Sequence, residues 1–306
     1  MMPQVSVILP SYNHAPFLEE RINSILNQTF QDFELIILDD NSPDNSREII
    51  EQYRDNPHVS HIVFNEKNTG STFVQWERGI ELSTGKYIWI AESDDSAAPE
   101  LLQTLFDNLL NNDAVLSYCQ SHKINKNGEI IGDWEDYSKA YEPELFSQDF
   151  VMEGKTFLER CYLIKNFIPN ASAVLFSKEA YLKTGGANPR VGYITDWLCW
   201  QKILTTGRVA YSHKKLNFYR SHDKSLVTKL WNDPKKLIHK KPHIEMRIAF
   251  NDFIKGQDGF KEIYRQNNRR LAKNMLEEAH FLFSNRKFAE GTRYGFSSLK
   301  YILKTI

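Results

Sequence analysis

Two short apolar runs that end in pairs of aspartates constrain the fold of this chain most. Residues 35–38 precede Asp39 and Asp40, and residues 87–91 come shortly before Asp94 and Asp95. Runs this apolar are typical of strands that are covered on both faces. In open α/β sheets, ligands bind in the crevice beyond the carboxyl ends of such strands. The sequence therefore predicts that both acidic pairs lie at a binding site.

Adjacent carboxylates repel each other unless a positive charge joins them. Hard oxygen ligands suit Mg²⁺ or Mn²⁺ better than zinc, so the pairs indicate a metal-bound nucleotide that carries phosphates. The alternative is structural, because aspartate is also common in the turns and helix caps that follow strands. Two such pairs in one series of strands and helices favour the functional interpretation.

Strands and helices alternate along the first part of the chain. Strands are expected at 5–9, 35–38, 61–64, 87–91 and 170–176, and helices from about Pro16, after Ser42, over 72–83, after Pro99 and from about Asp196. Short connections between alternating elements imply right-handed crossovers and a mostly parallel central sheet flanked by helices. The polar and aromatic residues 121–149 are expected to form a variable excursion. Beyond residue 229 we expect a helical appendage that ends in a hairpin, 271–283 and 288–303.

Charge is divided unevenly along the chain. From Lys214 to the end there are 21 Lys and Arg against 9 Asp and Glu, whereas the rest of the chain is acidic. A basic C-terminal region can contact an anionic membrane leaflet, and the alternative is a solvated surface that balances the acidic part. No apolar stretch is long enough for a membrane span, and no signal peptide is evident. The three cysteines lack the Cys-x-x-Cys spacing of a zinc site or a redox centre. We expect a cytoplasmic protein with domains at 1–228 and 229–306.

The ordered motifs resemble family-2 glycosyltransferases of the GT-A fold. The resemblance covers roughly residues 5–225. It rests on residues 5–13 as the opening strand and loop, 24–29 as the end of the first helix and 39–42 as the nucleotide-binding turn. Residues 68–70 and 85–88 match in the expected order. They are followed by 93–95 as the DxD-like segment and by 219–225 as the late Tyr-Arg-x-His segment. Ordered spacing over this length is more specific than a lone motif. The implied fold is a Rossmann-like α/β sheet.

The resemblance also implies roles for individual residues. Asp40 would accept the imide N–H of a uracil or thymine ring, with Pro10 and Tyr12 along the base. Asp95 would be the main metal ligand, and Asp94 would hold the ribose or a water. Arg220 and His222 would approach the diphosphate or the metal, although a lone histidine is as often structural.

Asp196 matches the position of the family's catalytic base, although the pattern here departs from the usual one. The carboxylate is single, because Thr195 stands where many members have a second acid, and an N-cap of the following helix is the alternative role. Many members also carry Ala-Arg-Asn after Asn-x-Gly, whereas residues 74–78 read Val-Gln-Trp-Glu-Arg, which leaves Arg78 as the candidate arginine. One positioned base favours single displacement with inversion. Trp197 and Trp200, three apart on one helix, are expected to fill the core.

The predicted function is single sugar transfer from a UDP- or dTDP-sugar, with Mn²⁺ or Mg²⁺, to a glycan or lipid-linked hydroxyl in cell-surface polysaccharide assembly. The alternative from another class is a non-catalytic nucleotide-sugar-binding scaffold subunit. A haloacid dehalogenase-type phosphohydrolase is disfavoured because Pro10, Ser11 and Tyr12 follow the first strand where that class needs an acid. No nucleic-acid partner is expected. Sequence alone leaves the donor sugar, the acceptor and the oligomeric state open.

Overall fold

The computed structural model describes residues 2–168, 170–188, 191–222 and 240–304, and the chain forms two compact units. The first unit comprises Met1–Glu153, Phe167–Ala187 and Thr206–Ser221. The second is helical and contains the C-terminal helices. The expected boundary between residues 228 and 229 falls outside the described residues, so this division of the chain stays a prediction.

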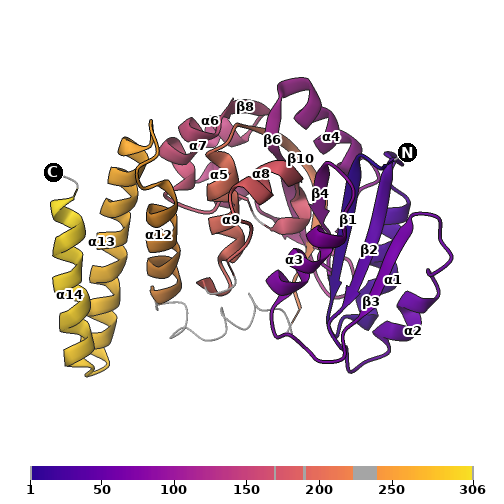
Figure 1. Ribbon diagram of the computed structural model, residues 1–306, viewed down its shortest axis with the longest axis horizontal. Helices are drawn as coiled ribbons and strands as arrows, with labels where there is room; N and C mark the ends of the chain where they lie inside the picture. The colour runs from indigo at the N-terminus through magenta and orange to yellow at the C-terminus, as the bar shows by residue number, and fades with distance from the viewer. Residues whose placement is uncertain (1, 169, 189–190, 223–239, 305–306) are drawn as a thin grey trace. The chain divides into compact units, whose positions relative to one another are not determined.

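One sheet forms the centre of the first unit (Figure 1). Its strands follow the order β3-β2-β1-β4-β9-β6-β10-β5, with β7 paired to β6 and β8 paired to β10. The bounds are β1 Val5–Ser11, β2 Phe33–Asp39, β3 Val59–Phe64, β4 Tyr87–Ile90, β5 Ser96–Ala97, β6 Ala114–Ile124, β7 Ile130–Asp133, β8 Phe150–Glu153, β9 Val174–Ser177 and β10 Arg208–Arg220. Strands β3, β2, β1 and β4 run parallel, as the sequence predicts. Beyond β4 the sheet is mixed, because β9 runs antiparallel to both β4 and β6.

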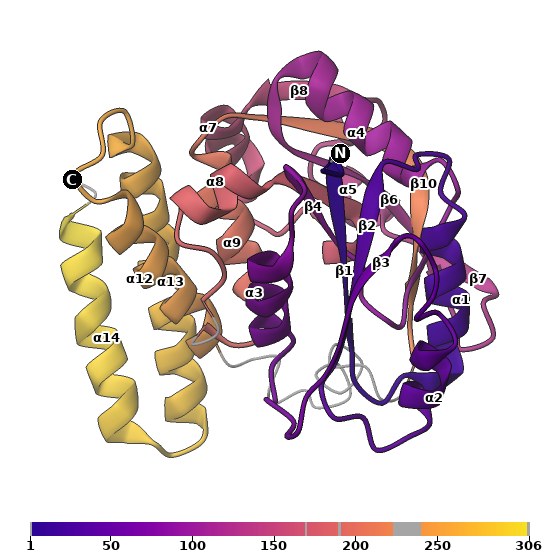
Figure 2. The ribbon, with the colours of Figure 1, turned by 45° about the vertical axis from the view of Figure 1, so that its right-hand side comes forward.

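Helices cover both faces of the parallel strands. The helices of the first unit are α1 Ala15–Leu26, α2 Ser46–Glu51, α3 Thr72–Leu82, α4 Leu101–Asn112, α5 Glu135–Lys139, α6 Pro143–Phe146 and α8 Lys178–Lys183. Figure 2 shows α3 on one side of β1 and β2, and α1 and α2 on the other. The approach of α3 requires glycine at position 79, because a Cβ there would lie 2.4 Å from Cγ2 of Ile8.

The core explains why β1 and β2 are mostly apolar; Ser6 and Glu34, which lie inside these strands, are buried and hydrogen-bonded to each other. Val5, Val7 and Leu9 alternate along β1 and pack in one cluster with Leu18 and Ile22 of α1. Every residue of β1 and of β2 is buried, including those that point to the opposite face. A strand covered on both faces has no exposed position for a polar side chain.

The excursion expected over residues 121–149 is more ordered than the sequence indicates. Strand β6 continues to Ile124, and β7, α5 and α6 follow it. Pairing with β7 and with the long strand β10 extends β6. The aromatic residues also order the segment, because Trp134 contacts Tyr137 and Tyr219 edge to face.

The second unit is helical, as expected for the end of the chain. It contains α7 Gly154–Phe157, a π-helical turn Leu158–Tyr162, α9 Thr195–Leu204, α12 Lys241–Ile254, α13 Lys261–Ser284 and α14 Phe288–Leu303. The predicted hairpin is confirmed, with α13 and α14 packed side by side (Figures 1 and 2). Trp197 and Trp200 are buried, as expected. Among the described helices, none has both the length and the apolar character needed to cross a membrane.

Candidate functional site

Asp40 is fixed at the carboxyl end of β2 by hydrogen bonds from three segments. Its carboxylate accepts from Asn65 Nδ2 at 2.7 Å, from the backbone N–H of Thr69 at 2.9 Å and from Gln75 Nε2 at 3.0 Å. The hydroxyl of Thr69 donates to the other carboxylate oxygen at 2.8 Å. Only 4% of the residue is exposed. The carboxylate is therefore held in one orientation at the edge of the sheet where the parallel strands end.

The other residues predicted to hold the nucleotide lie on β1, α3 and the loop between β1 and α1. Pro10 is buried within β1, and Tyr12, directly after this strand, is 46% exposed. Arg78 is on the exposed side of α3, where its guanidinium donates to the side-chain oxygen of Asn65. Because Asn65 also donates to Asp40, Arg78 connects to the Asp40 cluster through one intermediate side chain. A direct contact of Arg78 with a nucleotide stays a prediction.

Asp94 and Asp95 follow β4, which is separated from β2 only by β1 in the sheet. Asp95 is buried and accepts from the backbone N–H of Arg220 at 3.0 Å and from Asn170 Nδ2 at 3.1 Å. The Arg220 side chain donates to the backbone oxygen of Asp94 at 2.8 Å and to Glu20 at 2.6 Å. The end of β10 therefore fixes the turn that carries both aspartates. Contact of Arg220 with the diphosphate stays a prediction.

Negative charge is concentrated at this turn. Burial and the neighbouring Asp94 raise the pKa of Asp95 above its ordinary range. Burial, together with the charge of Asp94, also raises the pKa of Glu92 to about 8, although Trp76 Nε1 donates to its carboxylate at 3.0 Å. Glu92, Asp94 and Asp95 lie so close together that nearby positive charge is needed to keep them ionised.

Part of that positive charge comes from Arg21 on α1. Its side chain is completely buried, and its guanidinium carbon lies 5.1 Å from the centre of the Trp89 ring. None of its three side-chain nitrogens has a hydrogen-bond partner among the described residues. Burial lowers the pKa of Arg21 to about 10, and the charges of Asp95, Glu92 and Asp94 oppose that shift. Arg21 therefore acts on the acidic turn through its electrostatic field.

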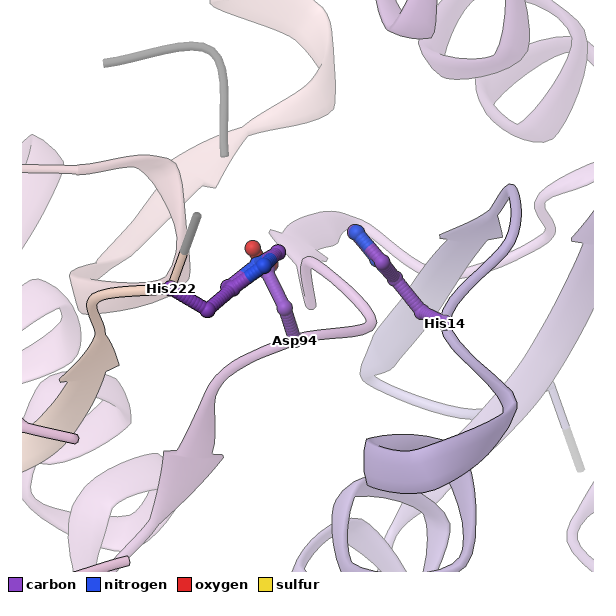
Figure 3. A group of neighbouring side chains, drawn as sticks. All are labelled: His14, Asp94 and His222. Carbon is purple, nitrogen blue, oxygen red and sulfur yellow. The ribbon is translucent and has the colours of Figure 1, made fainter. Parts of the chain in front are cut away.

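His14, Asp94 and His222 form a group that could hold a metal ion, and their ligand atoms all lie within 4.8 Å of one another. Figure 3 shows the three side chains extending toward one another from separate segments. His14 follows β1, and His222 comes two residues after the end of β10. Two imidazole nitrogens and a carboxylate suit Mn²⁺ better than Mg²⁺, which favours oxygen ligands. The structure thus places Asp94 in this group, and ligation by Asp95 stays a prediction.

Asp196 lies in the second unit, in the first turn of α9. The N-cap position of this helix is Ile194, so the alternative role of Asp196 as the N-cap is wrong. Its carboxylate accepts hydrogen bonds from backbone N–H groups of this first turn and from Asn166. Burial nevertheless raises the pKa of Asp196 to about 6. A carboxylate with this pKa is ionised at neutral pH and is a better proton acceptor than an exposed aspartate.

Sequence reasoning missed five residues around these carboxylates: His14, Arg21, Gln75, Glu92 and Asn170. The position of Arg21 carries a signal that could have found it, because it is the one charged residue among buried positions of α1. Asn170 carries no such signal, since it approaches Asp95 from a segment 75 residues away.

Comparison with known proteins agrees with the order of these elements. The model of the family described as glycosyl transferase family 2 matches residues 6–177. A putative teichuronic acid biosynthesis glycosyltransferase of Bacillus subtilis, TuaG, is 26% identical over 236 residues, which are 76% of this chain and 85% of the relative. A GalNAc(5)-diNAcBac-PP-undecaprenol beta-1,3-glucosyltransferase of Campylobacter jejuni is 26% identical over 49% of this chain and 48% of its own length.

Solved structures share the fold at low sequence identity. Staphylococcus aureus TarS 1-349 in complex with UDP-GlcNAc superposes with a TM-score of 0.71 at 16% identity, over 100% of this chain and 82% of that chain. The mannosyltransferase PcManGT from Pyrobaculum calidifontis, in complex with GDP-Man and Mn²⁺, has a TM-score of 0.61 at 16% identity, over 100% of this chain and 86% of that chain. Since the family model spans more than half of the sequence, the chain belongs to glycosyl transferase family 2, and it has the GT-A fold.

Proposed function

We propose that this glycosyltransferase moves one sugar from a UDP- or dTDP-sugar to a hydroxyl of a glycan or lipid-linked acceptor in cell-surface polysaccharide assembly, with inversion at the anomeric carbon. One observation carries the proposal: Asp40 follows β2 and Asp95 follows β4 at the same edge of the sheet, and hydrogen bonds from other segments hold both carboxylates. TarS was solved with UDP-GlcNAc, and the name of TuaG refers to teichuronic acid biosynthesis.

Asp40 is proposed to select the base of the donor. An ionised carboxylate accepts hydrogen bonds and donates none, so it favours a base with an N–H, such as uracil or thymine. The base would approach Oδ2, because Thr69 alone contacts that oxygen among the described residues, whereas Oδ1 already accepts from Asn65, Thr69 and Gln75. The donors on Asn65, Thr69 and Gln75 orient the carboxylate before the nucleotide arrives. Pro10 and the exposed ring of Tyr12 would lie along the base.

A divalent cation is proposed to be held by Asp94 and His222, with His14 as a further ligand. Asp95 would bind it either directly or through a water. When bound, such a cation neutralises the charge that develops on the leaving diphosphate. Mn²⁺ accompanies the donor in PcManGT. The nitrogen ligands favour Mn²⁺ over Mg²⁺ here. Arg220 is proposed to add positive charge beside the diphosphate, and Arg78 to approach it from α3.

Asp196 is proposed to take the proton from the acceptor hydroxyl as that oxygen attacks the anomeric carbon. A positioned general base contributes roughly 10²–10⁴-fold to such a step. The proton moves to the Asp196 carboxylate, the new glycosidic bond forms, and the bond to the diphosphate breaks on the opposite side of the sugar. One displacement of this kind inverts the anomeric configuration.

The acceptor is proposed to be presented at a membrane, with the basic C-terminal region as the peripheral contact. The Campylobacter jejuni relative is named for an acceptor linked to undecaprenol. Lys and Arg near an anionic leaflet gain attraction from its surface potential. A chain that works on this acceptor would be cytoplasmic, at the inner leaflet.

The experiment that tests this proposal is hydrolysis of a panel of UDP-, dTDP- and GDP-sugars without acceptor, with Mn²⁺ and with EDTA. We expect Mn²⁺-dependent release of UDP or dTDP, and loss of that release in the variant Asp94→Asn. Binding of a nucleotide sugar without any turnover, including turnover with glycan and lipid-linked acceptors, would instead favour the non-catalytic scaffold. Turnover of GDP-sugars alone would overturn the assignment of a uracil or thymine donor.

A further inference from the structure

Large apolar side chains are exposed at unusual density on the C-terminal helical hairpin. Of the fifteen large apolar side chains that are exposed among the described residues, seven lie on α13 and α14. They are Leu276, Phe283, Phe288, Phe296, Leu299, Ile302 and Leu303. Single exposed apolar residues are ordinary on soluble proteins, whereas a contiguous group marks a surface that contacts something.

One face of α14 is already used for packing within the hairpin. Tyr294 and Tyr301 pack against a buried cluster of Ile244, Leu271 and Met275. On the same face, a Cβ on Gly291 would lie 2.8 Å from the ring of Phe283, so the two helices are in close contact there. The face of α14 that packs against α13 therefore uses Tyr294, Tyr301 and Gly291, and Phe283 also contacts Phe288 at its edge.

The exposed apolar residues occupy a different face of α14. At about 100° per residue, Phe288, Phe296, Leu299 and Leu303 fall within roughly a quarter of the helix circumference. Phe296 and Leu303 are each 70% exposed. We call these four residues the apolar stripe.

A row of basic residues borders the apolar stripe. Arg293, Lys300 and Lys304 stand at i, i+7 and i+11, on the next strip around the helix, and all three are exposed. None of them forms an ion pair with another described residue. The single acid within α14 is Glu290. Arg293 and Lys304 lie near the rings of Tyr294 and Tyr301 instead. An apolar face bordered by cations that form no ion pair is the composition of helices that lie in a membrane interface.

We propose that the apolar stripe and its basic row dock on an anionic lipid surface, with α14 parallel to the membrane plane. The apolar side chains would enter the boundary between head groups and acyl chains, and the three cations would face lipid phosphates. A second copy of this chain fits the surface less well, because an antiparallel two-fold pairing across the stripe would bring the two basic rows together. The inference deepens the proposed function by naming the surface that contacts the membrane, and it rests on that proposal for its purpose.

Flotation of the full chain with vesicles tests the proposal. Vesicles of phosphatidylcholine alone are compared with vesicles that also contain phosphatidylglycerol. We expect flotation with the anionic vesicles and a decrease with added salt. The double variant Phe296→Ser/Leu303→Ser should lower the partition coefficient by about 100-fold, and Lys300→Gln/Lys304→Gln by about 30-fold.

Matched control variants change similar residues elsewhere. Ile130→Ser/Ile131→Ser removes two exposed apolar side chains from β7, and Lys86→Gln/Lys183→Gln removes two exposed cations. Both controls should float like the unchanged protein. Equal losses in the controls, or no flotation of the unchanged protein, would overturn the proposal. The proposal would also be overturned if light scattering showed that the unchanged protein is a dimer and that the variant Phe296→Ser/Leu303→Ser is a monomer.

Donor hydrolysis in solution separates this inference from the proposed function. It needs no membrane, and none of the four double variants touches a residue assigned to the site. Unchanged hydrolysis together with lost flotation supports the docking surface. Hydrolysis in the unchanged protein without any flotation removes the docking surface and leaves the proposed function. Flotation without turnover, with or without acceptor, removes the proposed function and leaves the surface.

Discussion

The side-chain amide of Gln75 donates a hydrogen bond of 3.0 Å to the carboxylate of Asp40, and both side chains are buried. Gln75 belongs to α3 and Asp40 follows β2, so this bond connects a helix to the edge of the sheet. It occurs in the segment 74–78, where the chain departs from the family's usual Ala-Arg-Asn. A neutral donor on α3 thus orients the carboxylate proposed to read the base.

The variant Asp40→Asn should weaken nucleotide binding. An amide would present N–H donors where the carboxylate accepts, both toward the base and toward Asn65, Thr69 and Gln75. Hydrogen bonds to charged groups contribute about 1.5–3 kcal/mol, so we expect the Kd of UDP to rise roughly 10- to 100-fold. Titration calorimetry measures this change. Asp107→Asn is the control, because Asp107 is exposed on α4 and accepts from Gln103 there. A UDP affinity unchanged in Asp40→Asn would contradict the role.

The sequence was sufficient to predict the elements in which local pattern and packing agree. The strands that end at Asp40 and before Asp94 are buried on both faces, so their apolar runs have a single interpretation. The hairpin α13–α14 was equally predictable, because a short polar turn separates two segments whose apolar residues recur at helical spacing. The antiparallel position of β9 between β4 and β6 could not be predicted, because the pairing partners of a short strand depend on residues distant in sequence.

Within the site, the sequence indicated the acidic residues and missed the groups that hold them. Asp40 and Asp95 follow apolar runs within a few residues, which is a local signal. Asn170 and the backbone of Arg220 reach Asp95 from segments 75 and 125 residues away, and only the folded sheet brings them there. Arg21 differs from these residues, because it stands three residues after Leu18 on the apolar stripe of α1, where a charged side chain is a local sign of burial.

Glu92 should make stability depend on pH in the metal-free protein. Burial raises the pKa of Glu92 to about 8, whereas the unfolded chain titrates near 4.5. The folded state therefore keeps a proton that the unfolded state releases, and stability falls as pH rises from about 4.5 to 8, by up to about 1.4 kcal/mol per pH unit. Glu92→Gln mimics the protonated form, so its stability should fall less steeply over this pH range than that of the unchanged protein. Urea unfolding in EDTA at several pH values measures it; parallel pH profiles for the two proteins would show that Glu92 ionises normally.

Mn²⁺ should stabilise the protein through the His14, Asp94 and His222 group. A ligand at 100 times its Kd stabilises the folded state by about 2.7 kcal/mol, which thermal unfolding resolves as a rise in Tm. Asp94→Asn should abolish the rise, and His14→Ala should reduce it. The control is His280→Ala, because His280 is exposed on α13, outside this group. An undiminished rise in Asp94→Asn would place the cation elsewhere, and a parallel test of Asp95→Asn would show whether that carboxylate holds it.

Asp196→Asn should decrease activity and increase stability at the same time. As the proposed base, Asp196 contributes roughly 10²–10⁴-fold to sugar transfer, and an amide cannot accept the proton. Because burial raises the pKa of Asp196 to about 6 from 3.8, the carboxylate stabilises the fold only while it is protonated. That contribution is complete below about pH 3.8 and is lost as pH rises through 6.

Above pH 7 the asparagine variant should therefore unfold at a higher temperature than the unchanged protein, with a gain of about 3 kcal/mol. In the unchanged protein, sugar transfer should rise with pH around 6, because the base must first lose its proton. The matched control is Glu262→Gln, an exposed acid in the first turn of α13. It should leave both activity and the pH profile as they are. If Asp196→Asn were as active as the unchanged protein, or if the rate did not change around pH 6, the general base would have to be another residue.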